Sequence, residues 1–120
     1  MTLNLLSLLC PCAACKASKM RKQPSAQLVT LLTNIAGAVP IDISSGVRCE
    51  AHNKAVGGAP ESQHLKGTAA DLRYKDSAEC YRIVRAAMMA GARFIEVATK
   101  HVHVDTRLNA HPQLVTGVSR

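Results

Sequence analysis

The sequence predicts an α+β domain in which a small central antiparallel sheet is flanked by helices. Its 120 residues are the length of one domain. Two segments carry the apolar spacing of helices that bury one face, and other short segments alternate apolar and polar residues as strands do. The resulting order of helix, strand, loops, strand, helix and hairpin favours the α+β class.

The first half of the predicted domain begins with a helix after Pro24. Ser25 is a suitable N-cap, and the apolar residues that follow it recur at i, i+3, i+4 and i+7. Gly37 and Pro40 are expected to end this helix. A short strand, one or two helical turns and a loop are predicted next, at residues 41–44, 49–56 and 57–60.

The second half is expected to hold most of the sheet. After a strand at residues 68–74, Asp76 and Glu79 have the spacing of a capping box, and Gly91 is expected to end the helix that they begin. Two short strands then pair as a hairpin, at residues 93–97 and 101–105. We therefore divide the chain into a Cys-rich basic lead-in, a central domain and a tail without strong pattern, at residues 1–24, 25–107 and 108–120.

The charge of the chain indicates an anionic partner or surface. Fifteen Lys and Arg against eight Asp and Glu give a net charge of +7. Nucleic acid and a bacterial cell wall fit that charge equally well. However, the chain has no Trp, only two Tyr and one Phe, and no recognition motif, so nucleic acid is not expected. No apolar run approaches the roughly 20 residues of a membrane span.

Five cysteines, an odd number, argue against a complete disulfide framework. Cys10, Cys12 and Cys15 are close enough in sequence to supply three thiolates to a structural zinc, with a fourth ligand such as Cys49 or His52. The simpler interpretation is three reduced thiols near a mobile terminus, and we favour it here. The opening ten residues superficially resemble a lipoprotein signal, but they lack a positive start, so a classical signal peptide is not expected.

The first chemistry-bearing motif places a histidine and an aspartate on either side of a glycine. His64 and Asp71 are seven residues apart, and Gly67 permits a sharp bend between them. Such a bend would let the two side chains converge on one point. His and Asp around a glycine turn also occur by chance, so the motif gains weight only with a partner.

The second motif lies on the last strand of the hairpin. Alternation places His101, His103 and Asp105 on one face, with two valines facing the core between them. A histidine of this strand together with His64 and Asp71 gives a His/Asp/His set. Two His and one carboxylate match a catalytic zinc site with an open fourth position.

A third motif surrounds Arg48, in a loop that follows the first predicted strand. The fork-shaped guanidinium of an arginine suits a carboxylate or an oxyanion. An ordinary surface arginine is the alternative interpretation of Arg48 taken alone.

These motifs together resemble a known family. The matching segments are Ser-Gly-Val-Arg at 45–48, the run from Asn to Asp at 53–71, and His-Val-His-Val-Asp at 101–105. They look like the zinc D-alanyl-D-alanine carboxypeptidase family, which also includes murein endopeptidases, D,D-dipeptidases of vancomycin resistance and phage endolysins. The Cys-rich lead-in is similar to that of small phage-type members.

The resemblance implies the zinc fold that these peptidases share with the signalling domain of hedgehog proteins. It also implies that His64, Asp71 and His103 hold zinc. Arg48 matches the arginine that contacts substrate or oxyanion, and His101 matches the first histidine of the His-x-His motif.

The identity of the general base is left open by one departure from the family pattern. Some relatives place an acidic residue three positions before the last ligand, where this chain has Lys100. We expect His101 to be the general base, which accepts the proton of the attacking water. A histidine side chain can accept and release a proton near neutral pH. Glu96 and Asp105 are the reserve candidates, although Asp105 is better suited to orienting a ligand histidine. Ser62 is expected to support the ligand loop.

The sequence therefore predicts a hydrolase: a zinc metallopeptidase that cleaves peptide bonds of peptidoglycan. It would be a D,D-carboxypeptidase or a murein endopeptidase, the latter including enzymes of endolysin type. We expect a monomer that stays cytoplasmic until it is released to the cell wall or periplasm. The alternative is a non-catalytic, hedgehog-like zinc module that binds murein.

Overall fold

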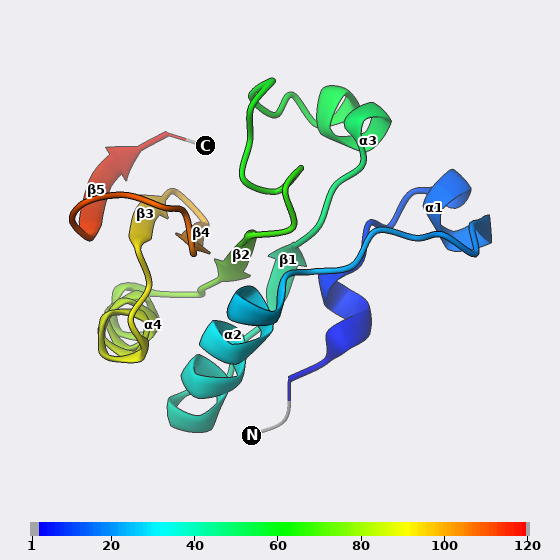
Figure 1. Ribbon diagram of the computed structural model, residues 1–120. Helices are drawn as coiled ribbons and strands as arrows, with labels where there is room; N and C mark the ends of the chain where they lie inside the picture. The colour runs from blue at the N-terminus through cyan, green and yellow to red at the C-terminus, as the bar shows by residue number, and fades with distance from the viewer. Residues whose placement is uncertain (1–2, 120) are drawn as a thin grey trace.

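The computed structural model describes residues 3–119, and Met1, Thr2 and Arg120 of the predicted lead-in and tail lie outside them. The fold is α+β, as predicted (Figure 1). The helical elements are the 3-10 turn η1 (Leu5–Leu8) and the helices α1 (Ala13–Ala17), α2 (Ala26–Ala38), α3 (Glu50–Ala55) and α4 (Ser77–Ala90). The strands are β1 (Ile43–Ser45), β2 (Ala69–Arg73), β3 (Phe94–Ala98), β4 (His101–Asp105) and β5 (Gln113–Val118). They form one sheet in the order β1-β2-β4-β3-β5.

Both long helices begin at their predicted caps, and α4 ends at the predicted glycine, whereas α2 runs through Gly37 and ends at Ala38, before Pro40. The Ser25 hydroxyl accepts a hydrogen bond from the Leu28 amide, and the Asp76 carboxylate accepts one from the Glu79 amide. Gly91 ends α4 in the left-handed conformation, at φ 88°. Among residues 3–119, no helix has both the length and the apolar character needed to cross a membrane.

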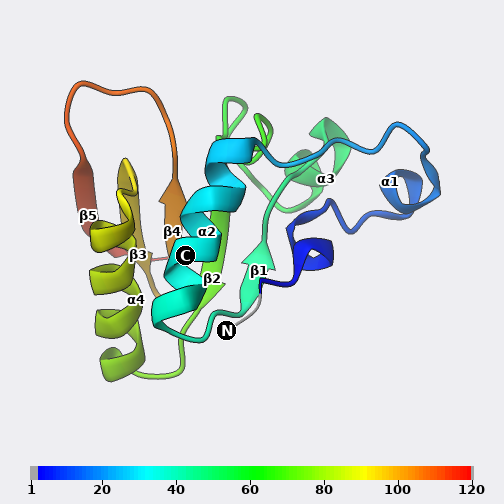
Figure 2. The same cartoon turned by 60° about the horizontal axis from the view of Figure 1, so that its bottom comes forward.

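The hydrophobic core lies between the sheet and the pair α2 and α4. Figure 2 shows both helices on the same side of the strands. On that side, Val102 and Val104 of β4 and Leu72 of β2 are fully buried, and they pack with apolar residues of the two helices. The period of two then directs the intervening residues of β2 and β4 to the opposite face. That opposite face is lined by the loop between β1 and β2, which includes α3 (Figure 1).

The tail contains a strand that the sequence did not indicate. β5 pairs in parallel with β3, and the other strand pairs are antiparallel, so the sheet is mixed. Most of β5 is exposed, including Leu114 and Val115, so it lacks the alternation that marks a half-buried strand. Its pairing depends on a partner far away in sequence, which local pattern cannot reveal.

The N-terminal segment packs against the start of the site-bearing loop. Leu8 is fully buried in the core, and its carbonyl oxygen accepts a hydrogen bond from the Val47 amide at 2.7 Å. Gly46 lies so close to the Leu8 backbone that a Cβ at this position would stand 2.7 Å from the Leu8 Cα. The absence of a side chain at Gly46 is therefore what permits this approach.

Candidate metal centre and active site

Three adjacent strands place polar side chains side by side on the face opposite the helices. In the strand register, Asp71 of β2 lies opposite His103 of β4, and His103 lies opposite Glu96 of β3. Directly paired residues project from the same face of a sheet. The central sheet therefore presents a carboxylate, an imidazole and a second carboxylate in one row.

His64 joins this row from the loop that precedes β2. Gly67 adopts a positive φ of 73° in that loop, which provides the predicted bend. The His64 Nε2 lies 3.2 Å from Asp71 Oδ1, and the His103 Nδ1 lies 2.9 Å from the same oxygen. One ligand atom from each of the three residues lies within 4.8 Å of the others, and all three residues are buried. The structure thus brings together the predicted His/Asp/His set.

The remaining nitrogen of each imidazole is held by an acceptor. His64 Nδ1 donates to the Gly46 carbonyl oxygen at 2.7 Å, and His103 Nε2 lies 2.8 Å from Asp105 Oδ2. Because a carbonyl oxygen only accepts, Nδ1 of His64 carries the hydrogen and Nε2 keeps its lone pair for a ligand. An acceptor behind each histidine is the usual arrangement around protein metal ions.

Asp105 is itself anchored by Arg107. The guanidinium of Arg107 donates to Asp105 Oδ2 at 2.7 Å through Nη2 and to Oδ1 at 3.0 Å through Nε. The guanidinium carbon also lies 3.7 Å from the centre of the Phe94 ring. Asp105 is fully buried and saturated by these partners, so the geometry suits orientation of His103 rather than proton transfer.

The charges of this cluster stabilise one another. Burial opposes ionisation of Asp71, but hydrogen bonds and charge interactions with His103 and His64 outweigh it and lower the pKa of the Asp71 carboxyl. Burial likewise disfavours charge on His103, yet its contacts with Asp105 and Asp71 raise the pKa of the imidazole. A bound cation would take over the role of the proton on His103, since neutral imidazole is the form that binds metal.

Arg48 lies next to Asp71, and several groups hold its side chain in place. Its Nε donates to the Ser45 hydroxyl at 3.0 Å, its Nη1 donates to Asn53 Oδ1 at 3.1 Å, and its Nη2 lies 3.6 Å from Asp71 Oδ2. The Arg48 amide also donates to the His64 carbonyl oxygen at 3.0 Å. A guanidinium fixed in this way has little rotamer freedom to lose when it binds an anion.

His101 lies on the same side of Asp71 as Arg48. Its Nε2 is 3.8 Å from Asp71 Oδ2, whereas His64 and His103 face Oδ1. This Nε2 is buried and makes no hydrogen bond to any residue that the structure describes. The predicted alternation of β4 is confirmed, because residues 101, 103 and 105 face the polar side and the two valines face the core.

A cavity of about 260 Å³ opens beside the cluster. Two cluster residues, His64 and His103, form part of its wall. Arg48, Glu96 and Arg107 add charges of both signs around them. Ser62 also lines the cavity, and its hydroxyl accepts a hydrogen bond from the His64 amide at 3.2 Å.

Asn53 and Gly58 belong to the site although the sequence did not single them out. The Asn53 amide group accepts from Arg48 and donates to the Ala59 carbonyl oxygen at 2.9 Å. A Cβ on Gly58 would overlap Asn53 Oδ1 and lie 2.8 Å from Arg48 Nη1. An asparagine shortly before a double-glycine segment was the available signal, but only the fold shows that it braces the arginine.

The His/Asp/His set fits a metal ion by its donor chemistry and by the acceptors behind each imidazole. A model of the Peptidase M15 family matches residues 2–105 of the chain. No curated protein matches it. The match covers most of the sequence, including every residue of the cluster, and this family consists of metal-dependent peptidases. The chain therefore belongs to the peptidase M15 family of zinc D-alanyl-D-alanine carboxypeptidase-like enzymes.

Proposed function

We propose that the protein is a zinc-dependent peptidase that hydrolyses peptide bonds in bacterial peptidoglycan. The observation that carries the proposal is the buried group of His64, Asp71 and His103. In each imidazole, the nitrogen that faces away from Asp71 is hydrogen-bonded to an acceptor. Membership of the M15 family supports peptide hydrolysis as the reaction.

Zinc is the metal we assign to this group. Two imidazoles and one carboxylate are a typical protein donor set of catalytic zinc in peptidases. His64 and His103 also line the cavity, where a substrate could reach the ion. When bound, zinc supplies Lewis acidity, which polarises a carbonyl group and makes water a competent nucleophile near neutral pH. His64 Nε2, a carboxylate oxygen of Asp71 and His103 Nδ1 would hold the ion.

Arg48 is proposed to bind the negative charge of the substrate. It lines the cavity, and its guanidinium is braced by Ser45 and Asn53. From this position it can stabilise the oxyanion that develops on the attacked carbonyl, or hold a terminal carboxylate of the substrate peptide. The first role serves an endopeptidase and the second a carboxypeptidase.

His101 is proposed to accept the proton of the attacking water and to pass it to the leaving amine. Its buried Nε2 has no hydrogen-bond partner among residues 3–119 and lies on the Arg48 side of Asp71. Glu96 is the reserve candidate, because it lines the cavity and is paired with His103 on the neighbouring strand. Asp105 is the weaker one, because His103 and Arg107 already occupy its carboxylate.

Peptidoglycan is proposed as the substrate on the basis of charge and family resemblance. A net charge of +7 favours the carboxylates and phosphates of a bacterial wall. A phage-type endolysin, held in the cytoplasm until release and acting as a monomer, is the biological role that fits these features. A non-catalytic module that binds murein is the alternative, because Lys100 stands where some relatives have an acidic base.

The decisive experiment is mass spectrometry of murein fragments after incubation with the zinc-loaded protein. We expect new peptide termini, whose identity reports the bond that is cut. The His64→Ala variant should yield none, since it lacks a metal ligand. Retention of the wild-type protein on murein without any new termini would overturn the enzyme proposal in favour of the binding module.

A further inference from the structure

A second group of metal-ligand side chains shares no residue with the His/Asp/His group. The sulfurs of Cys10, Cys12, Cys15 and Cys49, here called the four-cysteine cluster, approach within 4.8 Å of one another. Cys10 and Cys12 are 3.7 Å apart, Cys10 and Cys49 are 3.8 Å apart, and Cys12 and Cys49 are 3.7 Å apart, measured between Sγ atoms. The structure thus selects Cys49, not His52, as the companion of the three lead-in cysteines.

These distances match the edge of a tetrahedron of zinc ligands. A zinc–sulfur bond of about 2.3 Å places two sulfurs of a regular tetrahedron about 3.8 Å apart. Disulfide-bonded sulfurs would be about 2.0 Å apart and would separate the cluster into pairs. Instead, Cys10, Cys12 and Cys49 are equally spaced, and all five cysteines are free thiols.

The backbone brings the four sulfurs together through two short helices. Cys12 is the N-cap of α1, and Cys15 follows within its first turn. Cys49 is the N-cap of α3, and its sulfur accepts a hydrogen bond from the His52 amide at 3.3 Å. The cluster therefore joins the lead-in to a loop that is more than thirty residues later in the chain.

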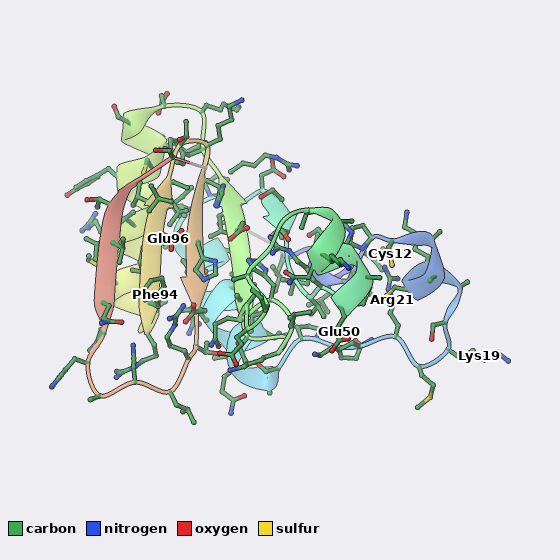
Figure 3. The ribbon with its side chains drawn as sticks, turned by 90° about the horizontal axis from the view of Figure 1, so that it is seen from above. Cys12, Lys19, Arg21, Glu50, Phe94 and Glu96 are labelled. Atoms are coloured by element: carbon green, nitrogen blue, oxygen red, sulfur yellow. The ribbon has the colours of Figure 1, made fainter. Side chains whose placement is uncertain are left out.

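A positive charge accompanies the cluster. The Arg21 guanidinium donates through Nη2 to the Cys10 carbonyl oxygen at 2.6 Å, and Figure 3 shows Arg21 and Cys12 at the same end of the molecule. The Arg21 Nε is buried and has no hydrogen-bond partner among the described residues. Four thiolates around a divalent ion leave an excess of negative charge, and a neighbouring guanidinium offsets it.

We propose that the four-cysteine cluster binds one zinc ion and that this ion is structural. Four protein sulfurs fill a tetrahedral site and leave no position open for water or substrate, which distinguishes it from the His/Asp/His group. Thiolate ligands favour zinc over magnesium or calcium. This site is separate from the proposed peptidase chemistry, and the two proposals stand or fall independently.

The proposed zinc would fasten the lead-in beside the active-site loop. Cys49 directly follows Arg48, and Cys10 lies two residues after the buried Leu8, whose carbonyl oxygen holds the Val47 amide. One ion bound to Cys10 and Cys49 would therefore hold the segments on both sides of the hydrogen bond between Leu8 and Val47. A small domain benefits from such a metal staple, because its core alone buries limited surface.

Two measurements on the full chain test the site. Protein prepared under reducing conditions with zinc sulfate should hold two zinc ions, and zinc X-ray absorption should show sulfur neighbours at about 2.3 Å. The double variant Cys12→Ser/Cys15→Ser should hold one zinc, lose the sulfur signal and unfold at a lower temperature. Cys80→Ser is the matched control, because Cys80 lies on α4 outside the cluster, and it should retain both ions.

His64→Ala separates this proposal from the peptidase proposal. That variant should lose the active-site zinc and keep the sulfur-coordinated zinc. If wild-type protein loaded with zinc shows no sulfur neighbours, the four-cysteine site is refuted, whatever its activity on murein. The site is also refuted if the double variant keeps the sulfur signal. Should that variant fail to fold, the absorption spectrum of the wild-type protein still decides.

Discussion

Asp105 lies two residues after His103 on β4 and faces its Nε2 at 2.8 Å, while Nδ1 of the same ring faces Asp71 at 2.9 Å. The imidazole of His103 is therefore clamped between two carboxylates in the sheet. This clamp determines which ring nitrogen is presented to the proposed zinc. We therefore expect Asp105 to influence the affinity for a metal that it does not touch.

Asp105→Asn should weaken zinc binding by about 10- to 100-fold, the usual effect of losing a carboxylate behind a ligand histidine. The amide keeps the size of the side chain but removes the charge that makes His103 a stronger ligand. Competition with a chromophoric chelator measures the change. Asp42→Asn is a suitable control, because Asp42 pairs with Arg73 on the exposed surface. Equal affinities for both variants would show that Asp105 does not support the site.

His64→Ala should abolish zinc binding at the active site and lower the unfolding temperature of the zinc-loaded protein. The variant removes one of the three proposed protein ligands, and metal binding stabilises only the folded state. Calorimetry with and without a chelator reports the loss. His111→Ala, at an exposed position, should behave as wild type. Full active-site occupancy in His64→Ala would refute the ligand assignment.

Arg48→Lys should reduce turnover of murein peptides more than it reduces stability. Lysine keeps the positive charge but loses the planar fork that now contacts Ser45 and Asn53 together. Turnover and unfolding temperature are measured on the same preparation. Unchanged turnover would remove Arg48 from the active site. Arg73→Lys, in the exposed ion pair, supplies the comparison for a substitution of the same kind.

His101→Ala should keep zinc and lose about two to four orders of magnitude in turnover, the span expected for a general base. Its Nε2 is 3.8 Å from Asp71, so the side chain is close to the ligands without belonging to them. Metal analysis beside the kinetic assay separates the two roles. Joint loss of zinc and activity would make His101 a ligand. Retained activity would move the role to Glu96 or Asp105, which Glu96→Gln and Asp105→Asn, each assayed at a zinc concentration that saturates the variant, then resolve.

Gly58→Ala should lower stability by about 1–3 kcal/mol, the cost of overpacking a filled site. The new methyl group would collide with Asn53 and displace the Arg48 side chain that Asn53 braces. Chemical denaturation measures the stability, and murein turnover should fall with it. Gly37→Ala is the control, since a Cβ there meets no atom within 4 Å. A Gly58→Ala variant as stable and active as wild type would contradict this packing.

The sequence predicted most of the elements that hold the proposed active site. Local signals were sufficient for α2 and α4, whose caps at Ser25 and Asp76 form as expected. Alternation on β4 placed His101 and His103 on one face, and Gly67 provides the bend before Asp71. The caps, the alternation and the bend each depend on residues that are close together in the sequence, so the sequence alone can predict them.

The remaining features depend on contacts between distant segments. β5 has no alternation and is held by its parallel pairing with β3. Asn53 is polar and lies in a short helix, and only its contact with Arg48 reveals its place in the site. Likewise, the sequence favoured three reduced thiols at Cys10, Cys12 and Cys15 and left Cys49 and His52 equally available as a fourth ligand. The fold of the α3 loop places Cys49 beside the other three.

Gly46 limits how the protein can be shortened or rebuilt. Its carbonyl oxygen orients His64, and its bare Cα accommodates the backbone of Leu8. A fragment that starts at residue 25 would keep every proposed zinc ligand of the active site. The fragment would also have a cavity where Leu8 packs in the core, and the Val47 amide would lose its hydrogen-bond acceptor close to His64 in the loop. A shortened form of the protein should therefore keep the segment around Leu8, and an added binding module is better joined after β5.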